Sequence, residues 1–144
     1  MTPTCPHRHR GDPPICTPEG ALTALSIASD AGRRTCVLVG GLDRARRPLT
    51  LVVVDDAGPG DVAVAVEVTV LRADVDRADV GPAAVFLASS GGAAVAEPGP
   101  AEVALLDGLD ARLARAGIVL LDWFMLRDGE ARSASHWAGR RARW

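Results

Sequence analysis

Four short apolar runs constrain the fold of this chain more than any other feature of its sequence. Each has six to nine residues and is bounded by charged or turn-forming residues: Thr35–Leu42, Pro48–Val54, Ala83–Ala88 and Ile118–Leu126. Continuous apolar runs of this length are typical of β-strands that are buried on both faces. None reaches the roughly 18 residues that a membrane-spanning helix needs. The runs therefore predict a buried sheet rather than a membrane protein.

The segments before and between these runs carry helix signals. Thr17 offers a capping hydroxyl directly before a proline and a glutamate, a combination typical of a helix start. Another helix is predicted from Pro100 to Gly117, because a single stripe holds its apolar side chains, Val103, Leu106, Leu109 and Leu113. The alternation of Val with Ala or Glu over Asp61–Asp74 fits a strand or a helix, and its place between two strands favours a helix.

The predicted elements follow the order αββαβαβ, with the short polar connection Asp43–Arg47 joining the first two strands as a hairpin. This order is typical of an α/β fold in which helices flank a mixed sheet. Residues 1–16 are rich in proline and lack hydrophobic periodicity, so we expect a disordered N-terminal tail. A single α/β domain is expected over residues 17–130, followed by an extension of residues 131–144 that contains Arg and Trp.

The composition excludes several kinds of chemistry. The chain has no Lys, Asn, Gln or Tyr, and all 16 of its basic residues are Arg. Without Lys there is no Schiff-base catalysis, no attachment of pyridoxal phosphate and no phosphate-loop lysine, and without Asn no N-glycosylation acceptor exists. The excess of Ala, Val, Gly, Pro, Arg and Asp is typical of a GC-rich gene, so an arginine cluster is weak evidence of nucleic-acid binding.

The beginning of the chain and its cysteines indicate a compartment. The first residues lack the apolar middle of a signal peptide, and no run could span a membrane, so we expect a soluble cytoplasmic protein. Three cysteines, an odd number, do not form a disulfide framework. We therefore expect Cys5, Cys16 and Cys36 to be reduced thiols.

The densest group of metal-binding side chains comprises Cys5, His7, His9 and Cys16. Thiolates and imidazoles are ligands that zinc prefers, and four of them within twelve residues could surround one ion. The Cys-x-His-x-His spacing differs from the paired spacings typical of zinc sites, so the alternative is a tail without a structural metal. Zinc is the one cofactor that the sequence suggests, and otherwise none is expected.

A serine hydrolase is a second catalytic interpretation. Ser90 follows an apolar strand in Ala88–Gly92, a stretch that resembles a nucleophile elbow. Asp122 and His136 come later, in the chain order of α/β-hydrolases. The chain is far shorter than those enzymes, no helix is predicted directly after Gly92, and His136 lies in a segment without a predicted element. The alternative is a Gly-rich turn that follows a strand.

Charge is uneven along the chain. Seven acids lie between Asp55 and Asp79 against two arginines, whereas the stretch Arg127–Trp144 holds five arginines and two acids. Within that ending, three arginines are interleaved with tryptophans and could dock a nucleic acid: Arg140, Arg141 and Arg143. The alternative is that the ending lies on the acidic stretch of its own chain or of a second copy, which would form a homodimer.

Three stretches resemble a known family. They are the strand and Gly-rich loop of Ala83–Gly92, the helix start at Pro100–Ala104 and the helix exit at Gly117–Trp123, which reads GIVLLDW. Together with the element order, these stretches are similar to the JAB/MPN metalloprotease-like domain, and most closely to its bacterial RadC-like branch. The resemblance implies a three-layer sandwich of the kind that cytidine deaminases also have.

The resemblance also implies that the family's chemistry is lost. Its two histidine positions fall on Ala88 and Ser90, and its Ser and Asp positions fall on Ala101 and Ala104. Alanine offers no metal donor, so the resemblance implies a non-catalytic accessory domain that binds an unknown protein or peptide. The expected binding surface comprises Ser89, Ser90, Gly91, Gly92, Glu97 and Ala101. The competing interpretations are a metal-dependent or serine hydrolase and a nucleic-acid-binding accessory protein.

Overall fold

The computed structural model describes residues 13–28, 36–57, 59–75, 81–90, 99–127 and 130–144. Its helices are α1 (Pro18–Ala28), α2 (Val62–Val75), α3 (Pro100–Arg115) and α4 (Ala134–Trp137), and a short 3-10 turn, η1 (Pro59–Asp61), leads into α2. Its strands are β1 (Cys36–Leu42), β2 (Pro48–Asp55), β3 (Ala84–Ser90), β4 (Val119–Arg127) and β5 (Glu130–Ser133). The predicted α/β class is confirmed, and β5 and α4 come in addition to the predicted elements.

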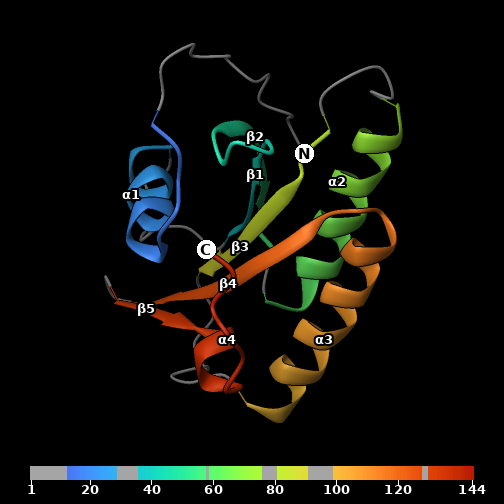
Figure 1. Ribbon diagram of the computed structural model, residues 1–144. Coiled ribbons are helices and arrows are strands. Elements are labelled where there is room, and N and C mark those ends of the chain that lie inside the picture. Colours follow the sequence, from blue (N-terminus) through green and yellow to red (C-terminus); the bar gives the residue numbers. More distant parts are fainter. Residues whose placement is uncertain (1–12, 29–35, 58, 76–80, 91–98, 128–129) are drawn as a thin grey trace.

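The five strands form one mixed sheet in the order β2-β1-β3-β4-β5 (Figure 1). The β3–β4 pair is parallel and is connected through α3, whereas the other three pairs are antiparallel. The predicted β1–β2 hairpin is confirmed. Asp43 fixes its turn, because Oδ1 of Asp43 accepts hydrogen bonds from the backbone N–H groups of Ala45 and Arg47, each at 2.9 Å.

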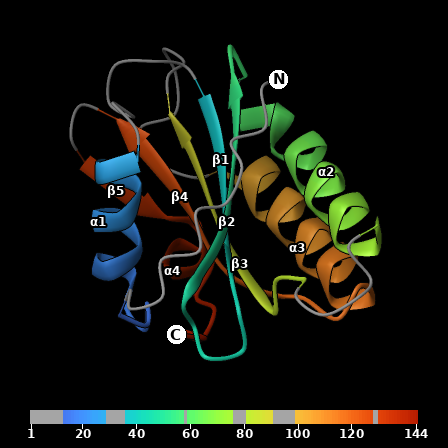
Figure 2. The same ribbon diagram turned by 90° about the horizontal axis from the view of Figure 1, so that it is seen from above.

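Helices cover both faces of this sheet. Figure 2 shows α1 on one face and α2 with α3 on the other, so the domain has three layers. All seven residues of β1 and all seven of β3 are buried, which agrees with the apolar runs that predicted these strands. Among the described residues, no helix is long and apolar enough to cross a membrane.

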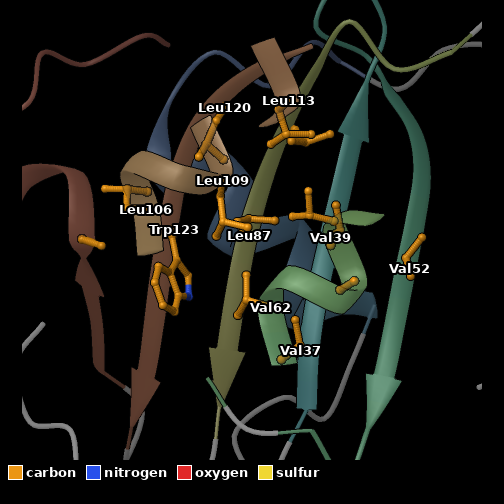
Figure 3. Packing of buried hydrophobic residues seen from close by; sticks show 14 of the residues in the cluster. Val37, Val39, Val52, Val62, Leu87, Leu106, Leu109, Leu113, Leu120 and Trp123 are labelled. Carbon is orange, nitrogen blue, oxygen red and sulfur yellow. The ribbon is translucent and has the colours of Figure 1, made fainter. Parts of the chain in front are cut away.

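The larger part of the core lies between the sheet and the pair α2 and α3 (Figure 3). Leu106, Leu109 and Leu113 of the predicted stripe are buried against it. The segment Asp61–Asp74, whose pattern fits a strand or a helix, forms the helix α2, which confirms the favoured prediction. This helix buries four apolar side chains in the same cluster: Val62, Ala65, Val66 and Val70. The sequence pattern of α2 is ambiguous because apolar residues surround most of this helix, so the 3.6-residue period is weak.

The domain includes residues before the predicted helix start. The hydroxyl of Thr17 accepts a hydrogen bond from the N–H of Gly20 at 3.1 Å, as expected of a helix cap. Ile15, however, is 8% exposed, packs with the α1 side of the core and donates its N–H to the carbonyl of Arg46 at 2.8 Å. Residues 13–16 were predicted as part of a tail, and Ile15 instead belongs to the domain.

The C-terminal extension is likewise part of the domain. Residues 130–133 add β5 to the sheet beside β4, and α4 follows directly. The final side chain, Trp144, lies with its ring centroid 6.0 Å from that of Phe86 and 6.1 Å from that of Phe124. The sequence analysis missed β5 because its residues, EARS, are mostly exposed and carry no apolar alternation.

A glycine in β1 provides a test of this packing. A Cβ atom added to Gly40 would lie 2.3 Å from Cζ of Phe86, whose side chain is buried and has little space to move. We expect Gly40→Ala to lower the free energy of unfolding by about 1–3 kcal/mol, because overpacking a core has that cost. Urea denaturation measures this change.

Gly108→Ala is the matched control. Gly108 is exposed on α3, and no heavy atom lies within 4 Å of its added Cβ. This substitution should raise the free energy of unfolding by about 0.5–1 kcal/mol, because alanine is the better helix former. Equal effects of the two substitutions would contradict the packing of β1 against Phe86.

Candidate functional site

Two serines at the carboxyl end of β3 are buried and hydrogen-bonded. Successive residues of a strand point to opposite faces, so Ser89 and Ser90 serve different layers. Ser89 lies on the α2 and α3 side, where its hydroxyl accepts a hydrogen bond from Nε1 of Trp123 at 3.0 Å. Ser90 lies on the α1 side, with its hydroxyl 3.3 Å from Sγ of Cys36. Ser89 is 3% exposed and Ser90 is 4% exposed, so both serines are buried.

Asp122 is the buried carboxylate of β4, and it organises the segment after the sheet. Its Oδ2 accepts a hydrogen bond from the hydroxyl of Ser133 at 2.6 Å, a short charge-assisted bond. Its Oδ1 accepts from the N–H groups of Trp123 at 2.7 Å and Ser135 at 3.3 Å. The hydroxyl of Ser133 also accepts from the N–H of His136 at 3.0 Å and thereby caps α4. Asp122 therefore holds the start of α4 in place.

The structure does not bring Ser90 and Asp122 together. Asp122 pairs with Phe86, which precedes Ser90 by four positions on β3. Four residues of a strand span about 13 Å, too far for a hydrogen-bonded triad. His136 contributes its backbone N–H to the cap of α4, and the residue is exposed. The three residues of the serine-hydrolase interpretation therefore have separate surroundings.

The start of α3 carries its own carboxylate. Oε2 of Glu102 accepts a hydrogen bond from the N–H of Gly99 at 2.8 Å, and Pro100 has no N–H to offer. This carboxylate balances the partial positive charge of the helix end, which disfavours an added anion. Ala101 is exposed in the same turn. Three other members of the expected binding surface lie outside the described residues: Gly91, Gly92 and Glu97.

The metal-ligand interpretation rests largely on the undescribed beginning of the chain. Cys5, His7 and His9 lie outside the described residues, and Cys16 is an exposed free thiol. In the described ranges, no three or more His, Cys, Asp or Glu side chains are placed to hold a metal ion. The zinc site at residues 5–16 stays a prediction.

The arginines near the C-terminus form ion pairs with α3. Asp110 lies 2.9 Å from Nη2 of Arg140 and 2.8 Å from Nη1 of Arg143, and Asp107 lies 3.1 Å from Arg140. The hydrogen bond from Arg143 holds the pKa of Asp110 below its usual value, and the same bond raises the pKa of Arg143. Arg141 is exposed. Two of the three arginines expected at a nucleic-acid surface therefore contact acids of α3.

Sequence reasoning expected the acidic partner of these arginines within residues 55–79, and it missed Asp110. It also missed Cys36 beside Ser90 and Ser133 beside Asp122. Ser133 could have been found, because a serine followed by short residues is a common helix cap. The partners of Ser90 and Asp110 depend on the order of strands and helices in space, and no local pattern carries that information.

Comparison of the sequence with known proteins assigns no family to this chain. No protein-family model matches the chain, and no curated protein matches it either. A function for the chain therefore has to be argued from the buried hydroxyls, the carboxylate of Asp122 and the surfaces around them.

The role of Asp122 as a structural anchor is testable at its partner. Ser133→Ala removes both the donor to Asp122 and the cap of α4, so we expect the free energy of unfolding to fall by about 1–3 kcal/mol. Ser135→Ala is the control, because Ser135 contributes only its backbone N–H to Asp122. Thermal unfolding monitored by circular dichroism compares the variants. A loss as large for Ser135→Ala would contradict the assignment.

The ion pairs of Asp110 predict a dependence of stability on pH. Because the folded pKa of Asp110 lies below its ordinary value of 3.8, the stability that its charge provides is present above that pH and is lost as pH falls below it. We expect Asp110→Asn to lower the free energy of unfolding by about 1 kcal/mol near neutral pH. The difference from the natural chain should shrink as the pH falls below 3.8.

Asp107→Asn is the matched control on the same helix. The side chain of Asp107 is 62% exposed and that of Asp110 is 17% exposed, so solvent screens Asp107 more strongly. Its substitution should change stability less at every pH. Denaturant titrations over a series of pH values measure both differences, and a constant difference for Asp110→Asn would contradict the charge-based explanation.

Proposed function

We propose that this chain is a non-catalytic binding domain, an accessory module that recognises a protein or peptide. One observation carries the proposal: Ser90 and Asp122, the serine and the carboxylate of the hydrolase interpretation, are buried and hold parts of the fold together. A catalytic serine needs an adjacent general base and access to its substrate. The hydrogen-bond partners of Ser90 and Asp122 include Cys36 of β1 and Ser133 of β5, so both groups connect elements of the sheet.

The resemblance to the RadC-like branch of the JAB/MPN domains is part of this proposal. At the positions where that family has metal ligands, Ala88 is fully buried, and Ala101 and Ala104 are exposed on α3. Ser90 already has its hydroxyl beside Cys36. Because a hydrolytic zinc ion takes about three protein ligands and alanine offers none, these residues do not fit a zinc centre. The proposed module is therefore a pseudoenzyme.

The start of α3 at the carboxyl end of β3 is the surface that we assign to the ligand. In open α/β sheets, ligands bind outside the carboxyl ends of parallel strands, and β3 and β4 are the parallel pair of this sheet. Ala101 and Ala104 give that helix end a surface of short side chains, which allows the backbone of a peptide to approach closely. The carboxylate of Glu102 favours a neutral or basic peptide over a phosphate group.

Chemical labelling tests the absence of catalysis. The full chain is treated with a fluorophosphonate probe, and the labelled residues are mapped by mass spectrometry, with Ser90→Ala as the control. We expect no labelling of Ser90, because the residue is buried and its hydroxyl lies 3.3 Å from Sγ of Cys36. Labelling at Ser90 that disappears in Ser90→Ala, or stoichiometric zinc together with peptide hydrolysis, would contradict the proposal.

Photo-crosslinking tests the binding surface. A photoreactive amino acid replaces Ala101 in one variant and Ala111 in another, since both alanines are exposed on α3 and lie about 15 Å apart along the helix. Crosslinking in cells of the natural host should give a discrete protein or peptide adduct from position 101. The same adducts from position 111 would show that the ligand does not bind specifically at the start of α3. No adduct from either position would contradict the proposed binding surface.

A further inference from the structure

The two edges of the sheet differ in a way that points to self-association. The outer strand β5 has four residues, mostly exposed, with Glu130 and Arg132 paired at 3.4 Å. Short, charged edge strands of this kind resist pairing with another chain. The other outer strand, β2, has eight residues and no charge before Asp55, and among the described residues no strand pairs with its outer edge.

The side chains of β2 are those expected of a strand with a further strand paired to its outer edge. Val52 and Val54 pack with the α2 side of the core, whereas Leu51 and Val53 pack with the α1 side. The interior residues of β2 other than Val52 are only partly buried, so apolar surface stays accessible on both faces of an edge strand. Figure 2 looks onto this edge and shows α1 and α2 on either side of β2. Pairing with another apolar strand would complete the burial.

Charges at the two ends of β2 have opposite signs. Arg47 directly precedes the strand, and Asp55 and Asp56 end it, all of them exposed. Among the described residues, these three side chains form no ion pair with one another or with other groups. The hairpin turn fixes the backbone of Arg47, which exchanges hydrogen bonds with Asp43. A strand that is basic at its start and acidic at its end is complementary to an antiparallel copy of itself.

We propose that the β2 edge is a self-association surface, at which a second copy of this chain adds in antiparallel orientation and joins two five-stranded sheets into one. A two-fold axis perpendicular to the sheet keeps each face on its own side, so residues on one face pair with residues on the same face. Pairing centred on Leu51 places Thr50 opposite Val52 of the second copy, and the irregularity of β2 at Leu49 lies beyond this pair. In this arrangement the basic end of β2, with Arg47, faces the acidic end of the second copy, with Asp55, twice by symmetry.

Charge complementarity selects this occupant over an unrelated strand. An unrelated apolar strand could cover the apolar centre of β2 without matching its charged ends. A second copy of this chain matches both, because its own sequence RRPLTLVVVDD has an apolar centre and charged ends of opposite sign. The inference is independent of the proposed function, because α3 and the carboxyl end of β3 lie away from the β2 edge in the sheet order. The ligand surface stays accessible in such a dimer.

Charge reversal tests the register. Sedimentation equilibrium of the full chain across about two decades of concentration should show a reversible monomer–dimer equilibrium. Arg47→Glu and Asp55→Arg should each weaken the dimer about tenfold, because two attractive pairs become repulsive. The double variant should restore the dimer, since its charges are again complementary. The side chains are exposed, so the fold should be kept, and circular dichroism checks this.

Arg44→Glu is the matched control. Arg44 is exposed in the same hairpin connection, and its substitution by Glu changes the net charge by the same amount as Arg47→Glu. In the proposed dimer, however, Arg44 faces no acidic residue of the second copy. The dimerisation constant should stay within about twofold of the natural chain. Equal weakening by Arg44→Glu and Arg47→Glu, or no restoration in the double variant, would overturn the register.

Hydrogen exchange gives a second readout that does not depend on substitutions. In the dimer, backbone N–H groups of β2 that face outward gain partners, so their protection should rise with protein concentration while that of β5 should not. A full chain that is monomeric at every concentration would overturn the proposal. If removal of residues 2–12 then produced a dimer, those residues, and not a second copy, would be the occupant of the β2 edge.

Discussion

Every side chain of β1 and β3 is buried, and this burial on both faces sets the conditions for all polar groups of the central sheet. Water does not reach them, so each hydroxyl or carboxylate needs a partner supplied by the protein. Trp123 provides it for Ser89, Cys36 for Ser90 and Ser133 for Asp122. These groups therefore serve the fold, and the surfaces that we propose for recognition, the start of α3 and the outer edge of β2, lie outside them.

Much of the fold could be predicted, because the strands that matter most are apolar throughout. The runs that became β1, β3 and β4 need no partner to be recognised, and the helix α3 has a clear stripe. β5 could not be found in the same way, because an edge strand can expose its side chains. The sequence predicts only an extension at residues 131–144, because the contact of Trp144 with Phe86 and Phe124 joins residues that are distant in sequence.

The candidate site was harder to predict than the fold. Ser90 ends β3 and Asp122 lies near the start of β4, so two residues in the right chain order occupy different levels of the sheet. The order of residues along the chain does not show how far apart Ser90 and Asp122 lie along the sheet, because this distance depends on the register between β3 and β4. The arginines show the same limit: their number and spacing are visible in the sequence, but Asp110 becomes their partner only through the packing of α3 against the C-terminal segment.

The hairpin of β1 and β2 also bears on the order of events during synthesis. Its strands are close in sequence, so they can pair as soon as they emerge, whereas β1 meets β3 only after α2 has been made. Until then the edge of β1 that later pairs with β3 has no partner strand, and α1 is the only helix of the fold that has been made. During synthesis there is therefore an interval in which the apolar strand β1 has an unpaired edge and is prone to aggregation. The rate at which α2 and β3 are made determines how long this interval lasts.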